Sequence, residues 1–387
     1  MRTLAEKNND YMIDVAKDST YLNQSDEYRR SYAEWRADPD NEYGYQFVHD
    51  TREHSYIDGK GYVPHLAEVA ESISLVKCCG LMGACMLIMA GMDLLWLFVS
   101  GAFFETSGYY IYRSQMHSAP QMSFTYVLAS GTACVARYLV PAIVYFKVTK
   151  LPGKVAFPSS KRRLDLLGHS VIIILLVMIM GRTVNGLSAE VFSWFNVDAL
   201  YSVVFFSFKP KTIIIAFFFN CIAIPIVQEL LFRGVFLQSF RQFGDLFAVL
   251  ATSFIGALCF YDFSYYWLVS IFFIVLGVVT IRTGSLFTAI VMSVISHIVN
   301  FVLSYLTLMG IENAKLIESL ISTAIIGTSI VAYAALITEK HKLLTVSQTP
   351  SGLRMVKKAQ LLISSTSVAL WVTVSVITSF LVMRFLQ

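Results

Sequence analysis

Long apolar stretches recur along the chain from residue 75 onward, and they limit the possible fold more than any other feature. A helix needs about 20 apolar residues to cross the hydrocarbon core of a bilayer. Nine stretches approach or exceed this length: 75–104, 123–147, 167–186, 211–240, 246–261, 264–282, 285–309, 315–338 and 360–386. Because lipid offers the backbone no hydrogen bonds, the sequence predicts an all-α, polytopic transmembrane helical bundle of eight or nine spans.

Composition excludes an ordinary soluble protein. Charged residues make up 14% of the chain, whereas a typical globular domain has about 25%. Six cysteines lie in or beside apolar stretches without a metal-type Cys-x-x-Cys pair, so neither a disulfide framework nor a metal site is expected. We predict no cofactor.

Charge is unevenly distributed. Residues 1–72 hold 8 Lys and Arg against 15 Asp and Glu, and the rest of the chain holds 22 against 11. The basic residues flank apolar runs, so they are expected to meet lipid headgroups, and nucleic acid is not an expected partner. Their clusters alternate between loops, which predicts a cytoplasmic N-terminus.

The acidic N-terminal segment contains one run typical of a helix. It extends from Glu27 to Arg36 and is followed by Asp38-Pro39-Asp40, which should end it because proline disfavours helix in the preceding residue. We expect the segment to be a solvated tail, with a docking surface as the alternative. No secretory signal peptide precedes the first apolar stretch.

Ionisable residues inside the apolar stretches are candidates for function, because they are costly in lipid. Glu229 and Arg233 are four residues apart, hence on one helix face and able to pair, and Gln228 adjoins them. Pro225 removes a backbone donor and should distort the helix just ahead of Gln228. The pair either stabilises the packing of the helices or positions a carboxylate that accepts and donates a proton in catalysis.

A second polar pair lies in the seventh stretch. His297 and Asn300 are three residues apart and therefore share a helix face. Either residue can serve packing or chemistry. Together with Glu229 they suggest a shared intramembrane site. The helices offer no convincing third ligand nearby, so a metal is not expected there.

These residues resemble the motifs of the CAAX-protease and bacteriocin-processing (CPBP, Abi) family, which includes type II CAAX prenyl endopeptidases. The family motif E-E-x-x-x-R corresponds to Gln228-Glu229-Leu230-Leu231-Phe232-Arg233, and Phe243-Gly244 also matches. The second motif, F-x-x-x-H, should fall within Thr252–Asp262, where no histidine occurs. The third, H-x-x-x-N, corresponds to His297 with Asn300 one residue early.

The resemblance implies intramembrane peptide cleavage, in which the first glutamate and a histidine activate water and the third motif stabilises the oxyanion. Gln228 has no carboxylate, and Phe260 or Tyr261 cannot replace an imidazole. We therefore predict a degenerate relative that binds a hydrophobic or lipidated peptide, or another membrane protein, without efficient cleavage. The alternatives are an active endopeptidase that uses Glu229 and His297, with Arg233, Asn300 and Gln228 in its site, and a transporter.

Charge, hydropathy and the resemblance together predict the organisation of the chain. An acidic cytoplasmic segment, 1–72, precedes two additional spans and a basic loop, 73–164. The family core covers 165–338, and a basic loop with a last span covers 339–387. The family's usual range and the lack of a signal peptide predict the plasma membrane of a bacterium.

Overall fold

A computed structural model describes most of the membrane part of the chain and one segment of its N-terminal region. The described residues are 25–44, 56–57, 61–62, 66–104, 122–159, 164–193, 207, 209–260, 263–308, 313–338, 367 and 371–376. Nearly all of these residues are helical, and the predicted fold class is confirmed.

Eight of the nine predicted apolar stretches are helices or parts of helices. They are α3 (Leu66–Phe104), α4 (Phe124–Val148), α6 (Leu164–Ser193), the run of short helices from Pro210 to Phe243, α10 (Asp245–Leu258), α11 (Phe263–Thr283), α12 (Leu286–Leu308) and α13 (Ala314–Thr338). The ninth stretch, 360–386, lies largely outside the described residues, with 371–376 helical.

Five of these segments are long and apolar enough to cross a membrane: Glu71–Ser100, Phe124–Val148, Pro210–Phe243, Tyr266–Thr283 and Leu286–Leu306. Shorter apolar helices cover Leu167–Arg182, Asp245–Leu258 and Leu316–Ala332. Large apolar side chains point outward along them, including Phe98, Ile214, Trp267 and Val331. The chain is therefore an integral membrane protein, because water would penalise so much exposed apolar surface.

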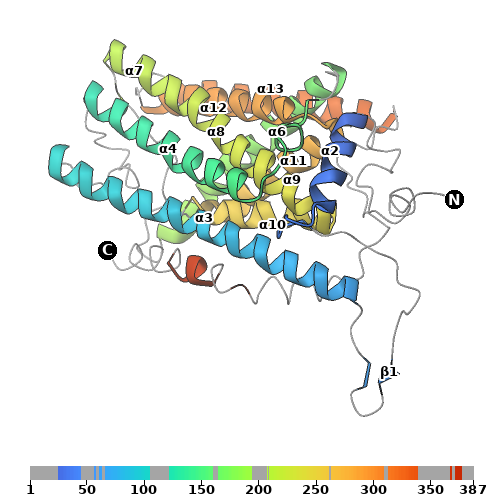
Figure 1. The fold of residues 1–387 in the computed structure, drawn as a ribbon. Helices are drawn as coiled ribbons and strands as arrows, with labels where there is room; N and C mark the ends of the chain where they lie inside the picture. The colour runs from blue at the N-terminus through green and yellow to red at the C-terminus, as the bar shows by residue number, and fades with distance from the viewer. Residues whose placement is uncertain are drawn as a thin grey trace.

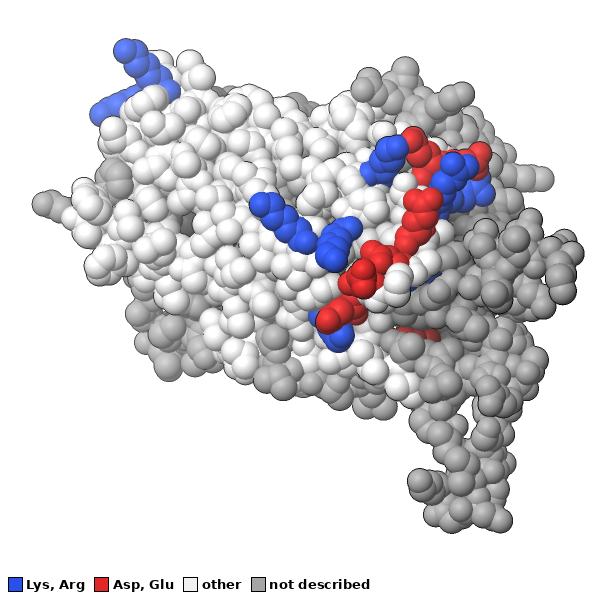
Figure 2. Space-filling model, viewed as in Figure 1, with Lys and Arg blue, Asp and Glu red and all other residues white. Residues whose placement is uncertain are grey.

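The helices pack as a bundle with α12 among its inner members (Figure 1). Helix α12 contacts α6 and α11 and also the segment from Phe218 to Phe236. Charged side chains gather around α2 and the end of α4, and a few lie at the tip of α7; the surface between them is uncharged in this view (Figure 2). This distribution fits a helical bundle whose two ends meet water.

The N-terminal helix α2 (Asp26–Ala37) matches the predicted run. Ser25 caps it by accepting a 3.2 Å hydrogen bond from the backbone N–H of Tyr28, and Asp38 ends it ahead of Pro39. The solvated-tail interpretation is wrong for this helix, because it lies against one end of the bundle with Tyr28, Tyr32 and Trp35 buried (Figure 1).

Two small elements complete the fold. Strands β1 (Tyr56–Ile57) and β2 (Gly61–Tyr62) form an antiparallel hairpin that the all-α prediction did not include. Helix α5 (Gly153–Ala156) follows α4 and contacts α2. Lys154 of α5 forms an ion pair with Glu27, which ties the N-terminal helix to the basic loop.

Candidate functional site

The helix that carries the first motif is irregular at the positions where the motif residues lie. It comprises α7 (Pro210–Phe217), the π-helix η2 (Phe218–Ala223), α8 (Ile224–Glu229), the π-helix η3 (Leu230–Phe236), α9 (Leu237–Phe240) and the 3₁₀ turn η4 (Arg241–Phe243). Pro225, which has no backbone N–H, is the second residue of α8, immediately after the π-helical turn η2 and Ile224, so the predicted distortion is confirmed. Such π-helical turns are frequent at functional sites.

Glu229 and Arg233 form the ion pair that their spacing predicts. Nε of Arg233 lies 3.3 Å from Oε2 of Glu229, and both side chains are almost completely buried. The guanidinium also stacks on the ring of Phe273, 3.8 Å from its centroid, and donates to the Phe273 carbonyl at 3.2 Å. Neither carboxylate oxygen of Glu229 accepts a hydrogen bond from the described residues, so the hydrogen-bonding capacity of the buried pair is only partly used.

Ser293 of α12 lies between Glu229 and His297. Its hydroxyl is within interaction range of the Glu229 carboxylate, although neither group completes a hydrogen bond. Its carbonyl is 2.8 Å from Nδ1 of His297. Since a carbonyl only accepts, Nδ1 carries the hydrogen and a neutral ring presents its lone pair on Nε2. Within the described chain no hydrogen bond or ion pair joins Glu229 to His297 directly.

Gln228, at the place of the family's first glutamate, belongs to a different polar cluster. Its side chain is buried and lies within interaction range of the hydroxyl of Tyr138 on α4. That hydroxyl accepts a 2.7 Å hydrogen bond from Nη1 of Arg137. Arg137 is paired with Asp93 of α3 at 2.8 Å.

Arg137 also reaches the segment where the second family motif should lie. Its Nη2 donates a 2.6 Å hydrogen bond to the carbonyl of Cys259, at the end of α10. An arginine from α4 therefore lies where the resemblance led us to look for a histidine. Neither Gln228 nor Arg137 is a proton acceptor, and the carboxylate of this cluster, that of Asp93, is held in an ion pair by Arg137.

Asn300 is held by a third cluster on the other side of His297. Its Oδ1 accepts a 2.7 Å hydrogen bond from Nη1 of Arg182 on α6. The same nitrogen donates to Ser304 at 3.1 Å, and Arg182 forms a 2.7 Å ion pair with Glu318 of α13. The five predicted site residues therefore belong to three polar clusters. Two of these clusters include residues of α12.

The sequence analysis missed Arg137, Arg182, Glu318 and Ser293. The first three are ionisable residues in or near apolar stretches, and that signal alone marks them for inspection. Ser293 gives no such signal, because serine is common in membrane helices. Among the described residues no group of three His, Cys, Asp or Glu side chains is placed to hold a metal.

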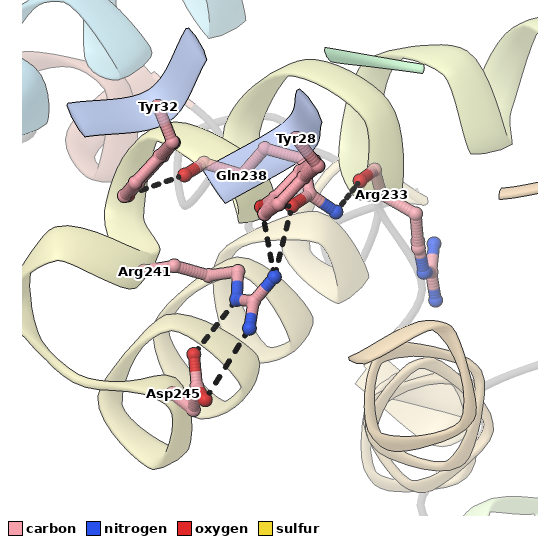
Figure 3. Close-up of polar contacts among 6 residues, drawn as sticks. All are labelled: Tyr28, Tyr32, Arg233, Gln238, Arg241 and Asp245. Atoms are coloured by element: carbon pink, nitrogen blue, oxygen red, sulfur yellow. Dashed lines mark hydrogen bonds and ion pairs between the residues drawn. The ribbon is translucent and has the colours of Figure 1, made fainter. Parts of the chain in front are cut away.

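The end of the motif helix is fastened to α2 by a fully buried polar network (Figure 3). Tyr28 donates to Oε1 of Gln238 at 2.7 Å, and Tyr32 donates to the Gln238 carbonyl at 3.0 Å. Arg241 donates to the Tyr28 hydroxyl and forms an ion pair with Asp245, each at 2.8 Å.

Gln238 connects this network to the first motif. Its Nε2 donates a 3.1 Å hydrogen bond to the backbone carbonyl of Arg233, whose guanidinium points away from the cluster (Figure 3). Gly244 follows with φ 112°, a conformation that favours glycine, and lets α10 begin at Asp245 within reach of Arg241. Burial raises the pKa of Tyr28 and of Tyr32, since the tyrosinate form would lose its hydration.

Comparison with known families agrees with the motifs. Residues 210–303 match the family model described as "Type II CAAX prenyl endopeptidase Rce1-like". Neither a curated protein nor a solved structure matches the chain significantly. The matched segment contains Gln228, Glu229, Arg233, His297 and Asn300, and it lies inside the predicted core 165–338, whose own limits stay a prediction. The chain is therefore an integral membrane protein that carries, over residues 210–303, a segment similar to the Rce1-like type II CAAX prenyl endopeptidases.

Proposed function

We propose that this protein is a non-cleaving member of its family that binds a hydrophobic or lipidated peptide, or a membrane-spanning partner, through the helices of residues 210–303. The observation that carries the proposal is the contact of Gln228 with Tyr138 and, through it, with Arg137. None of these three residues has a carboxylate or an imidazole, and the carboxylate beside them, that of Asp93, is held in an ion pair by Arg137.

Two further contacts support the loss of catalysis. Arg233 holds the carboxylate of Glu229 in a buried ion pair, so this carboxylate is already engaged within the bundle. Arg182 holds the Asn300 side-chain oxygen in a cluster with Ser304. Losing one catalytic group typically reduces a rate by orders of magnitude, and here two positions of the family's motifs lack their usual groups.

The test uses the purified full chain and a farnesylated peptide that carries a photo-crosslinking group. We expect crosslinks within residues 210–303 and an intact peptide by mass spectrometry. The same peptide without the farnesyl group is the control and should crosslink weakly. A cleaved product that is absent for Glu229→Gln would overturn the proposal.

One variant sharpens this test. Gln228→Glu restores the first motif carboxylate, yet we expect no cleavage, because the segment Thr252–Asp262 still lacks a histidine. If Gln228→Glu alone turned the protein into a protease, the second motif would be dispensable and the stated reason for inactivity would be wrong.

The placement of Ser293 favours a second candidate function, an active endopeptidase with a rearranged site. Ser293 adjoins Glu229 and orients His297 so that Nε2 carries the lone pair. In this mechanism Nε2 of His297 takes a proton from water as the water oxygen attacks the substrate carbonyl carbon, and Arg233, positioned by Glu229, stabilises the charge on the carbonyl oxygen. The C–N bond then breaks, and His297 gives the proton to the leaving amine. The candidate requires cleavage by the wild-type chain that disappears both in Glu229→Gln and in His297→Ala.

We also propose that the end bearing α2 faces the cytoplasm of a bacterial cell. The exposed basic residues Lys150 and Lys154 lie at this end, and Lys154 pairs with Glu27 of α2. Positive charge marks cytoplasmic loops in membrane proteins. A membrane-impermeant thiol reagent should label Ser31→Cys, on α2, in inverted but not in right-side-out vesicles.

A further inference from the structure

Two exposed lysines lie at the end of α4 that adjoins α2. Lys147 belongs to the last turn of α4, and Lys150 is the second residue after the helix. Neither ammonium group has a hydrogen bond or an ion pair within the described part of the chain, whereas the nearby Lys154 is paired with Glu27. Two positive charges are therefore available to an anion from outside the protein.

The backbone turn after α4 brings the two lysines close together. The N–H of Lys150 donates to the carbonyl of Lys147 at 3.3 Å, which places their Cα atoms within about 7 Å of each other. Lys150 has φ 50°, and the other described residues with positive φ are Gly244, Gly284 and Asn313, the types that adopt this conformation most readily. A lysine here costs stability that a glycine would not, and such strain is common where a side chain has a function.

Contacts with α2 hold this turn in place. Nε1 of Trp35 donates a 2.8 Å hydrogen bond to the carbonyl of Thr149, the residue between the helix and Lys150. The hydroxyl of Thr149 donates to the carbonyl of Tyr145 at 2.8 Å, and all three side chains are buried. Since the backbone is already fixed, only the lysine side chains need to become ordered when an anion binds.

An exposed line of side chains leads from the lysines along α4. Leu139, Ile143 and Lys147 follow one another at steps of four residues, so they lie on the same side of the helix, and all three are exposed. The span Phe124–Val148 is long and apolar enough to cross a membrane, and the described chain continues past its end into α5. Leu139 and Ile143 therefore face acyl chains, and the lysines lie where the span meets the headgroups.

The molecule that fits this surface has an anionic head and an apolar tail. Lysine is a common phosphate ligand, and basic residues next to a membrane span attract anionic lipids. An acyl chain attached to the same phosphate would contact Ile143 and Leu139. A soluble acidic peptide would match the lysines but leave these apolar side chains without a partner.

We propose that the end of α4 binds an anionic phospholipid, whose phosphate is held by Lys147 and Lys150 and whose acyl chain lies along Ile143 and Leu139. The inference goes beyond the proposed function and does not depend on it, because the lipid binds here whether or not a peptide binds to residues 210–303.

The experiment measures lipid binding to the purified full chain by native mass spectrometry, with dioleoylphosphatidylglycerol or dioleoylphosphatidylcholine added to the detergent. We expect the tightest site to prefer phosphatidylglycerol by about tenfold, because only this lipid has a net negative charge. Glycerol phosphate, which has the anionic group without acyl chains, should not displace the lipid at equal concentration. Equal binding of the two lipids, or displacement by glycerol phosphate, overturns the inference.

Two matched variants locate the site. Lys147→Gln/Lys150→Gln should weaken phosphatidylglycerol binding by about 30-fold, at roughly one factor of five for each lysine. Lys209→Gln/Lys211→Gln also removes two exposed lysines, at the start of α7, and should leave the tightest site unchanged, because residues two positions apart do not face each other. Equal losses in the two variants would show an effect of net charge alone and overturn the inference.

A third variant separates the lysine from its backbone conformation. Glycine adopts φ 50° without strain, so Lys150→Gly without added lipid should melt at a higher temperature than the wild type. It should nevertheless bind phosphatidylglycerol about fivefold more weakly. Misfolding cannot explain weaker binding by a more stable protein, and unchanged binding overturns the inference.

Discussion

The hydroxyl of Tyr28 donates a 2.7 Å hydrogen bond to Oε1 of Gln238, although the two residues are 210 positions apart in the chain. Gln238 in turn donates to the carbonyl of Arg233, the residue that pairs with Glu229. The N-terminal helix α2 is thus joined, through one glutamine, to the π-helical turn that places Arg233.

This contact predicts the effect of Tyr28→Phe. The change removes the donor to Gln238 and the acceptor for Arg241 inside a buried network, so we expect a loss of about 1–3 kcal/mol of stability. Thermal unfolding in detergent measures it. Glu34→Gln, on the exposed side of α2, is the control and should change stability by less than about 0.5 kcal/mol. Equal effects of the two changes would mean that the network contributes nothing.

The same tyrosines predict a pH dependence. Burial raises the pKa of Tyr28 and of Tyr32 above the usual value of about 10. The folded state therefore holds their protons more tightly than the unfolded state does, so stability is complete below about pH 10 and falls as the pH rises through the raised pKa values. A tyrosinate absorbance titration of the wild type minus that of Tyr28→Phe/Tyr32→Phe should show two late-titrating groups. A difference centred near pH 10 would contradict the prediction.

A small residue on α10 sets the position of Phe273, the ring under Arg233. A Cβ added at Gly256 would lie 2.8 Å from Phe273 and 3.0 Å from Phe232. Gly256→Ala should therefore destabilise the bundle by about 1–3 kcal/mol through overpacking. Gly327→Ala on α13, where nothing lies within 4 Å, should instead be neutral or stabilise by up to about 1 kcal/mol. Melting temperatures of the two variants test the opposite signs.

The Asp93–Arg137 pair predicts a non-additive double mutant. Its side chains are 16% and 10% exposed, so Asp93→Asn alone leaves a poorly solvated guanidinium and should cost about 3 kcal/mol. Asp93→Asn/Arg137→Gln removes both charges and should cost less than Asp93→Asn. The surface pair Glu42–Lys77 is the reference, with a coupling energy of at most about 1 kcal/mol. Additive effects at the Asp93–Arg137 pair would show that the two charges do not interact.

Much of the fold could be predicted because it depends on local properties. The length and hydrophobicity of each stretch predicted eight helices whose ends agree with the structure to within a few residues. The exceptions are α3, which begins earlier than predicted, and α6, which ends later. The Glu229–Arg233 pair followed from helical spacing alone, and the distortion beside Pro225 followed from its missing N–H.

Only the tertiary structure decided which polar residues meet. Asp93 lies 44 residues from Arg137, Arg182 lies 136 from Glu318, and Tyr28 lies 210 from Gln238. Such contacts depend on which helices become neighbours and on how each is rotated, and neither property is encoded within a single apolar stretch. For that reason the sequence by itself determined the helices, the lipid environment and the Glu229–Arg233 pair, whereas the contacts of Gln228 with Tyr138 and of Asn300 with Arg182 required the assembled bundle.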